Sequence, residues 1–282
     1  MKKIGIIGGG TMGSGIAQIT ASSNYSTTLL DISDELLEKS LSKIKKSVSR
    51  LVEKGKLTQE AFDNIISNIK TTTKYEELGE CDLVIEAVSE NKNIKKQVFQ
   101  NIEKHINKNC IIASNTSTFP ITELGLYTSR PDLFVGIHFF NPAPVMKLVE
   151  IIRSLTVSNE TIEIAKTFAI SLGKEPVIAK DRPGFIVNRI LLPMINEAVF
   201  VFEEGVASAE DIDKAMQLGT NHPMGPLALT DLIGLDITLD ILDVLYDEFK
   251  DPKYRAAPLL RQMVRAGRLG RKTGKGFFEY KK

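Results

Sequence analysis

The sequence has few cysteines, almost no excess charge and no long apolar run, and each shortage excludes a class of protein. Its 282 residues include only two cysteines, Cys81 and Cys110, which lie in apolar surroundings without the spacing of metal ligands. We therefore expect no metal site and a reduced, cytoplasmic setting. The formal net charge of +1 argues against a general partnership with nucleic acid or with a membrane surface.

No part of the chain is predicted to enter a membrane. The first ten residues, MKKIGIIGGG, hold only four apolar side chains before the glycine run, too few for the core of a signal peptide. No later stretch is long enough to span a bilayer. A hydrophobic content of 43% beside 25% charged residues favours a globular chain of one large domain or two smaller ones.

The centre of the chain carries two apolar segments with one ionisable residue in each. Residues 133–140 and 145–152 are joined by Asn-Pro-Ala-Pro, whose prolines exclude a helix and predict two strands around a rigid turn. Burying His138 of the first segment or Glu150 of the second alone would be costly, so we expect them to contact each other. A carboxylate on one imidazole nitrogen makes the other nitrogen a better general acid or base. The alternative is two unrelated residues at strand ends, each meeting water.

The N-terminal region carries a glycine pattern that is typical of dinucleotide binding. Gly8, Gly10 and Gly13 form G-x-G-x-x-G between an expected strand at residues 3–7 and an expected helix at 14–22. The first glycine permits the tight turn, the second lets a pyrophosphate approach the backbone, and the third lets the helix pack on the strand. The helix N-terminus then offers N–H groups and partial positive charge to the phosphates. A glycine-rich turn without a ligand is the alternative.

An acidic residue follows the second expected strand. The apolar run at residues 27–30 ends in Asp31, 18 residues after Gly13. An acid at that strand end can accept hydrogen bonds from both hydroxyls of the adenosine ribose and would repel a 2′-phosphate. The next few residues include no arginine, so the sequence favours NAD over NADP as the cofactor.

A basic helix with two distinct faces is expected at residues 34–54. Apolar residues recur along it at spacings of three and four, and basic residues follow the same spacing two positions later, about 200° around the helix. Gly55 ends this helix and Thr58 caps a second one through Ser67, so a helical hairpin at about 34–68 is inserted into the dinucleotide fold. The basic face is either a solvated surface or a clamp for an anionic substrate carrier.

Further buried strands complete a doubly wound, mostly parallel sheet of about eight strands. Glu86 and Glu90 flank the C-terminal end of one strand, where ligands of such sheets bind; Lys95 lies on the following helix, with plain surface charge as its alternative role. Five small polar residues, Ser114 to Thr118, follow the next strand and would place hydroxyls and an amide in the crevice, with helix capping as the alternative. The strands are expected at residues 69–72, 82–88, 110–113 and 175–179, alternating with helices.

The composition changes after Arg182, and the rest of the chain is expected to be helical. We therefore predict a Rossmann-type α/β domain at residues 1–182, which binds NAD, and an all-α domain for substrate binding and dimerisation at 183–282. The helix at 185–202 is apolar on almost every side, which requires burial and favours packing against another subunit. Asn188 on this helix either points into a cleft between the domains or bonds the backbone internally.

Four long motifs, together with the glycine turn, resemble one family. In chain order they are HFFNPAPVMKLVEI, DRPGFIVNRI, GTNHPMGPLALTDLIGLD and GRKTGKGFFEY. They resemble the L-3-hydroxyacyl-CoA dehydrogenases, most of all the stand-alone short-chain form, and the resemblance covers essentially the whole chain. It implies an NAD-dependent oxidoreductase that interconverts (S)-3-hydroxyacyl-CoA and 3-ketoacyl-CoA, with 3-hydroxybutyryl-CoA and acetoacetyl-CoA as the short-chain pair.

The resemblance also implies roles for individual residues. His138 and Glu150 would be the catalytic acid/base pair, and Ser117 and Asn188 would act beside them on the substrate. Acyl-CoA binding would involve the helical hairpin. The substrate contacts would be Ser117, Asn188, Arg50 and Lys54, and the cofactor contacts would be Gly8, Gly10, Gly13, Asp31, Glu90, Lys95, Asn115 and Lys272.

Two other functions remain open at this point. One is an NAD-dependent dehydrogenase of a free hydroxy acid or sugar acid on the same scaffold, against which the basic hairpin argues. The other is a non-catalytic protein that kept the fold. The presence of His138, Glu150, Ser117 and Asn188 together argues against it. The helical second domain favours a homodimer or a higher homo-oligomer.

Overall fold

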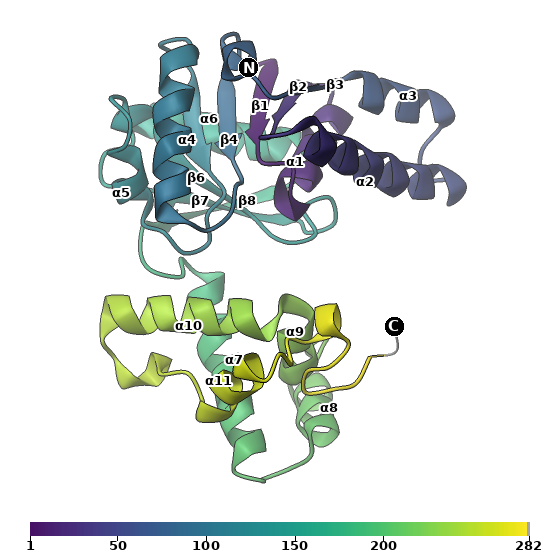
Figure 1. Cartoon of the computed structure of the whole chain (residues 1–282), viewed down its shortest axis with the longest axis vertical. Helices are drawn as coiled ribbons and strands as arrows, with labels where there is room; N and C mark the ends of the chain where they lie inside the picture. The colour runs from purple at the N-terminus through teal and green to yellow at the C-terminus, as the bar shows by residue number, and fades with distance from the viewer. Residues whose placement is uncertain (281–282) are drawn as a thin grey trace. The chain divides into compact units, whose positions relative to one another are not determined.

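The structure, a computed structural model, describes residues 1–280. The chain falls into two compact units, an N-terminal unit at Met1–Arg182 and a C-terminal unit that begins at Pro183 (Figure 1). No helix within residues 1–280 is both long enough and apolar enough to cross a bilayer.

An eight-stranded sheet is the centre of the N-terminal unit. Its strands are β1 (Lys3–Ile7), β2 (Ser26–Leu30), β3 (Ile69–Thr72), β4 (Leu83–Glu86), β5 (Ile111–Ser114), β6 (Phe134–Phe139), β7 (Leu148–Arg153) and β8 (Glu175–Lys180). They lie in the order β3-β2-β1-β4-β5-β6-β7-β8; β1 to β6 are parallel, β7 reverses against β6, and β8 is parallel to β7. The prediction of a doubly wound, mostly parallel sheet is confirmed. Its order changes direction between β1 and β4, so a ligand crevice is expected at their C-terminal ends.

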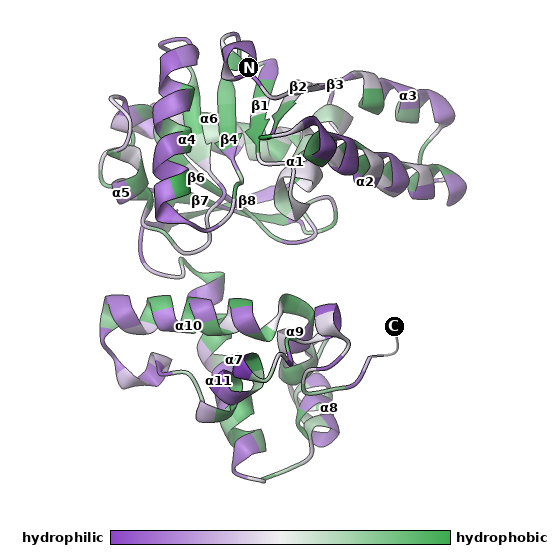
Figure 2. Cartoon of the chain, in the orientation of Figure 1, coloured by the Kyte–Doolittle hydropathy of each residue, from purple (hydrophilic) through white to green (hydrophobic). Residues whose placement is uncertain are grey.

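Helices cover the sheet on both faces and bury its central strands. In Figure 1, α4 lies in front of the strands and α6 behind them. Strand residues such as Ile4, Ile85 and Val135 are fully buried, and Figure 2 shows the apolar residues gathered in the strands. The helices on the sheet are α1 (Thr11–Ser22), α4 (Lys92–His105), α5 (Ile121–Gly125) and α6 (Asn159–Ser171), with short 3-10 turns at Tyr75–Leu78 and Pro131–Leu133.

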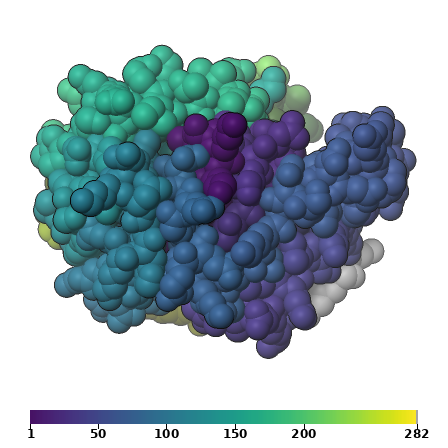
Figure 3. All heavy atoms as spheres, turned by 90° about the horizontal axis from the view of Figure 1, so that it is seen from above, coloured from purple at the N-terminus to yellow at the C-terminus, as the bar shows by residue number. Residues whose placement is uncertain are grey.

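The predicted helical hairpin is present between β2 and β3. It consists of α2 (Asp34–Glu53) and α3 (Gln59–Ser67), and it protrudes from the sheet edge in Figures 1 and 3. Ser33 and Thr58 cap the two helices by accepting backbone N–H groups with their hydroxyls. One face of α2 packs on the unit and the basic face is exposed, as the spacing predicts. The buried residues of α2 are Leu37, Ser40, Ile44 and Val48.

Within residues 183–280, the C-terminal unit is a bundle of five helices around its own apolar core. Gly234, with a φ of +107°, separates two of its helices. Only one side of α7 is buried within residues 1–280: Leu192 and Val199 are inside, whereas Ile190 is 70% exposed. The helices are α7 (Val187–Glu203), α8 (Ala209–Thr220), α9 (Pro226–Ile233), α10 (Leu235–Phe249) and α11 (Pro258–Arg265), with 3-10 turns at Pro252–Tyr254 and Arg271–Thr273.

A single buried carboxylate, Asp231 of α9, holds the C-terminal segment in place. Its oxygens accept the backbone N–H groups of Phe277 and Phe278 at 2.9 Å each and the Tyr280 hydroxyl at 3.0 Å. The side chain is 1% exposed. The residue that anchors this aromatic segment is therefore an acid on a helix distant in the sequence.

Replacing Asp231 should destabilise the C-terminal unit. In Asp231→Ala, two backbone N–H groups lose a charged acceptor, and we expect the free energy of unfolding to fall by about 3 kcal/mol. Urea denaturation followed by circular dichroism measures it. Asp247→Ala on the exposed face of α10 is the control, with an expected change of about 0.5 kcal/mol or less. Equal effects of the two substitutions would contradict the anchoring role.

Candidate active site

Three glycines shape the loop between β1 and α1, and the space around them suits a dinucleotide. Gly8 has a φ of +99°, a conformation that other residues rarely adopt. A Cβ on Gly13 would lie 1.7 Å from the Gly8 carbonyl oxygen, so any side chain would push the helix off the strand. Around Gly10, nothing lies within 4 Å of an added Cβ. A pyrophosphate can therefore approach the backbone there, beside the N–H groups that begin α1.

Asp31 follows β2 and binds the glycine loop directly. Its Oδ2 accepts the Gly9 N–H at 2.6 Å, and its Oδ1 accepts the Ile32 N–H at 2.6 Å. Each carboxylate oxygen keeps a further lone pair, and the group is only half-buried. Asp31 therefore lies beside the glycine loop, where its carboxylate can accept hydrogen bonds from ribose hydroxyls. The glycine loop and Asp31 together fit NAD.

His138 and Glu150 face each other across the antiparallel strands β6 and β7. They are directly paired in register, and His138 Nδ1 lies 2.8 Å from Glu150 Oε2. Their side chains are 8% and 1% exposed, so the contact is almost dry. The predicted contact is present, and the alternative of two unrelated residues meeting water is wrong. With Nδ1 engaged by the carboxylate, proton exchange falls to Nε2.

A second buried charge pair, Glu86 and Lys95, lies behind the crevice. Lys95 Nζ is 2.7 Å from Glu86 Oε1, and the two side chains are 1% and 0% exposed. Burial raises the pKa of the Glu86 carboxyl, while Lys95 and the Ser114 hydroxyl, which donates at 2.7 Å, oppose that rise. The idea that Lys95 is plain surface charge is therefore wrong. Glu86 lies in an apolar run of the sequence, as His138 does. The same argument, that a buried charge needs a partner, would have predicted a partner for Glu86.

The charge network extends from Lys95 to the polar segment after β5. Lys95 Nζ is also 3.4 Å from Glu90 Oε2. Glu90 accepts the Thr116 hydroxyl at 3.0 Å and the Ser117 N–H at 3.0 Å. The backbone that carries Ser117 is thus tied to a carboxylate that is partly exposed at the crevice, whereas Thr116 also accepts the Phe119 N–H as a local cap.

The remaining predicted residues of the N-terminal unit are Asn115, at the end of β5, and Arg50 and Lys54, at the end of α2. Asn115 Oδ1 accepts the Phe139 N–H at 2.9 Å and so joins the ends of β5 and β6. Arg50 and Lys54 are exposed near the end of α2 and make no ion pair within residues 1–280. No cluster of His, Cys, Asp or Glu in the described part of the chain could hold a metal ion.

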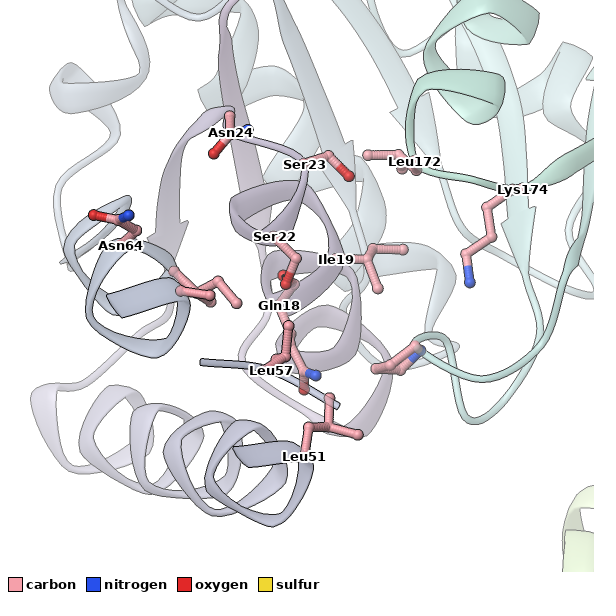
Figure 4. Close-up of a pocket in the computed structure, with 13 residues that line it drawn as sticks. Gln18, Ile19, Ser22, Ser23, Asn24, Leu51, Leu57, Asn64, Leu172 and Lys174 are labelled. Carbon is pink, nitrogen blue, oxygen red and sulfur yellow. The ribbon is translucent and has the colours of Figure 1, made fainter. Parts of the chain in front are cut away.

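A groove runs between α1, the hairpin and the turn after β6, all within the N-terminal unit. Its larger chamber has a volume of about 470 Å³, and a smaller one of about 230 Å³ shares Gln18 and Pro144 with it (Figure 4). The smaller chamber is lined by Thr11 of the glycine loop and by Lys43 and Ser47 of α2. The hairpin and the dinucleotide loop therefore border one common space.

Two predicted residues, Asn188 and Lys272, belong to the C-terminal unit. Asn188 is half-buried in the first turn of α7, and its side chain makes no hydrogen bond within residues 1–280. The backbone bond considered for it belongs instead to Asn196, which donates to the Arg255 carbonyl at 3.0 Å and accepts the Ala257 N–H at 2.8 Å. Lys272 forms an ion pair with Asp236.

These features together define the class of protein. The doubly wound sheet carries a dinucleotide loop at its switch point and a buried imidazole–carboxylate pair. This combination is that of a dehydrogenase that uses NAD.

Comparison with known proteins defines the family. Residues 3–182 match the model of the 3-hydroxyacyl-CoA dehydrogenase NAD-binding domain, and residues 184–280 match that of the 3-hydroxyacyl-CoA dehydrogenase C-terminal domain. The chain belongs to the 3-hydroxyacyl-CoA dehydrogenase family, and its cofactor is NAD.

Individual relatives are similar to this chain over nearly their whole length. A 3-hydroxybutyryl-CoA dehydrogenase of Clostridioides difficile is 50% identical over 99% of this chain and 100% of its own. The human mitochondrial hydroxyacyl-coenzyme A dehydrogenase is 42% identical over 100% of this chain and 92% of its own. The crystal structure of an (S)-3-hydroxybutyryl-CoA dehydrogenase from Ralstonia eutropha is 50% identical, with a TM-score of 0.97 and full coverage of both chains.

Replacing only one residue of the Glu86–Lys95 pair should lower the free energy of unfolding more than replacing both. Glu86→Gln leaves a buried ammonium without its carboxylate, and we expect the free energy of unfolding to fall by about 3 kcal/mol. Glu86→Gln with Lys95→Met should recover most of that loss. Urea denaturation of the single and double variants measures the coupling. Glu35→Gln, from the exposed Glu35–Lys39 pair, is the control with little expected change; additive losses in the double variant would contradict the buried pairing.

Proposed function

We propose that this enzyme interconverts (S)-3-hydroxybutyryl-CoA and acetoacetyl-CoA, with hydride passing to or from NAD. The buried His138–Glu150 contact of 2.8 Å carries the proposal, because oxidation of a hydroxyl needs a proton acceptor as well as a hydride acceptor. The four-carbon substrate is supported by the two relatives at 50% identity, which are named as 3-hydroxybutyryl-CoA dehydrogenases.

His138 moves the proton at Nε2 while Glu150 holds Nδ1. In oxidation, neutral His138 takes the proton of the substrate 3-hydroxyl; in reduction, the imidazolium returns it to the ketone oxygen. NAD, when bound, accepts or supplies the hydride. Glu150 fixes the tautomer and stabilises the imidazolium through a nearly dry contact, where electrostatic attraction is strong.

Ser117 and Asn188 hydrogen-bond the substrate oxygen or the thioester. The Ser117 hydroxyl makes no hydrogen bond within residues 1–280, while its backbone is fixed by Glu90, so the group is positioned and available to a ligand. A side-chain donor held in advance at the reacting oxygen stabilises the charge that develops there. The side-chain amide of Asn188, which bonds no other described residue, supports the same role from α7.

The cofactor is held by the glycine loop and by the residues at the ends of the parallel strands. The open space at Gly10 and the position of Asp31 support contacts with the pyrophosphate and the ribose. Lys95 is buried, so it acts through Glu90 rather than at the surface. The residues assigned to the cofactor site in this proposal are Gly8, Gly10, Gly13, Asp31, Glu90, Asn115 and Lys272, with Lys95 acting through Glu90.

The hairpin binds the phosphates of coenzyme A. Lys43 and Arg50 are exposed on α2 and Lys54 is exposed at its C-terminal end, and none of the three makes an ion pair in the described part of the chain. Clustered cations that no carboxylate neutralises attract a polyanion. Lys43 also lines the chamber that reaches the glycine loop, which supports a substrate path from the hairpin to the cofactor.

The working enzyme is a homo-oligomer in a reducing compartment, the cytoplasm. The exposed apolar side chains of the C-terminal unit, including Ile190 on α7 and Leu218 on α8, support a self-association surface there. Cys81 and Cys110 are unpaired and buried, which supports a reducing setting.

Loss of the imidazole should abolish most of the turnover. In His138→Gln, we expect the kcat of acetoacetyl-CoA reduction by NADH to fall about 10³-fold, within the range of general acid–base catalysis, with the KM for NADH within about twofold. Initial-rate assays that follow the absorbance of NADH measure both quantities. His105→Gln, at the far end of α4, is the control and should retain normal turnover. A His138→Gln enzyme with a tenth or more of the normal kcat would refute the assignment.

The same assay separates the two candidate substrate classes. Wild-type enzyme should reduce acetoacetyl-CoA and leave free acetoacetate nearly untouched, because the hairpin contributes only to a substrate that carries phosphates. Comparable kcat/KM values for the two would favour the alternative, a dehydrogenase of a free hydroxy acid or sugar acid.

Removing the acid at the end of β2 should relax the choice of cofactor. Asp31→Ala loses charged hydrogen bonds to the ribose, so the kcat/KM for NADH should fall about tenfold or more while that for NADPH rises or stays level. Asp63→Ala on α3 is the control at an exposed acid. Cofactor kinetics that remain those of the wild type would remove Asp31 from the ribose site.

A further inference from the structure

The turn between β6 and β7, residues 140–147, is conformationally restricted and lies next to the acid/base pair. Two prolines restrict its backbone, and the Pro142 carbonyl accepts two N–H groups of the turn at 2.9 and 3.0 Å. The ring of Phe140, at its start, has its centroid 4.6 Å from that of His138. A rigid turn moves as one piece, so its position depends on what it touches outside itself.

Lys174 holds this turn from one side. It lies between α6 and β8, and its Nζ donates to the carbonyl oxygens of Ala143 at 2.7 Å and Met146 at 2.8 Å. The residue is 8% exposed, and Figure 4 shows its side chain at the wall of the groove. No carboxylate forms an ion pair with it within residues 1–280.

An ammonium buried in this way is costly, and burial lowers the pKa of Lys174. An apolar side chain of the same length would avoid that cost, and water in the neighbouring groove could reach the two carbonyls. Fold stability alone therefore does not account for a lysine here. What the lysine supplies is a fixed link from the start of β8 to two carbonyls of the turn, at Ala143 and Met146.

Gly15 limits the same turn from the other side. Ala143 is 2% exposed and packs on α1, and a Cβ on Gly15 would lie 3.2 Å from both Ala143 Cβ and Pro144 Cδ. The α1 helix begins at the glycine loop. This close contact therefore sets the distance between α1 and the turn that follows His138.

We propose that Lys174 and Gly15 are positioning residues for the acid/base hairpin. Lys174 draws the turn against the sheet and Gly15 lets it settle on α1, and together they fix His138 relative to the glycine loop. This inference rests on the proposed function, and it adds two residues that act through the turn rather than on the substrate.

Lys174→Met tests the first residue, because it removes the donors and keeps the length of the side chain. In the purified full-length enzyme, we expect the kcat of acetoacetyl-CoA reduction to fall about tenfold or more, since misplacement of a reacting group by about 1 Å can cost 10²-fold. The KM for NADH should stay within about twofold. The thermal midpoint should shift by about 3 °C or less, because the cost of burying the charge disappears with it. Lys166→Met, on the exposed side of α6, is the matched control.

Gly15→Ala displaces the same turn from the opposite side. We expect the same pattern with a smaller loss of kcat, about threefold to tenfold, because the turn has to give way by only a few tenths of an ångström. Gly219→Ala is the matched control: it is also a helical glycine, but nothing lies within 4 Å of an added Cβ.

The outcomes separate this inference from the proposed function. Wild-type turnover of acetoacetyl-CoA with both variants equal to their controls would overturn the positioning role and leave the proposed function intact. So would a loss expressed only in the thermal midpoint, or a loss of NADH affinity as large as the loss of kcat. A wild-type enzyme that does not reduce acetoacetyl-CoA would overturn both.

Discussion

The N-terminal unit is organised by one constraint, that charge removed from water must meet a partner. Glu150 is buried against His138 and Glu86 against Lys95, and each contact joins two separate elements, β7 to β6 and α4 to β4. In the proposed function, the first pair supplies a proton acceptor. The second anchors Glu90 and, through it, the backbone of Ser117. The same requirement that makes the buried charges tolerable therefore also fixes the groups that would touch a substrate.

The reversal of chain direction at β7 is what brings the acid and the base together. Because β7 runs against β6, residues 138 and 150 lie directly opposite each other, and the turn between them stays at the C-terminal edge of β6. Parallel sheets present ligands at that edge. A parallel crossover would have carried Glu150 away on a long connection, and a slip of one residue would have turned its side chain to the other face. Topology and register thus decide the chemistry as much as residue type does.

Local patterns in the sequence predict most of the elements and the acid/base contact, but they do not predict which polar residues are buried. Lys92, Lys95 and Lys96 lie close together on α4, yet only Lys95 turns toward Glu86, and the choice depends on how the helix packs. Likewise, Asn188 and Asn196 lie on one helix, and packing against Arg255 and Ala257 selects the second for the internal bonds. The roles of Lys174 and Asp231 also depend on segments far away in the sequence, so spacing along the chain carries no signal of them.

The substrate class depends on parts of the chain outside the dinucleotide fold. A glycine loop and a His–Glu pair would serve the oxidation of many hydroxyl compounds, because neither contains a group that recognises coenzyme A. In the proposed function, the hairpin recognises the phosphates of that carrier. On α2, Lys39 is neutralised by Glu35, whereas Lys43, Arg50 and Lys54 have no ion-pair partner within residues 1–280. In the proposed function, the unpaired cations on an inserted element that borders the glycine loop tie general hydride chemistry to a substrate carrying phosphates.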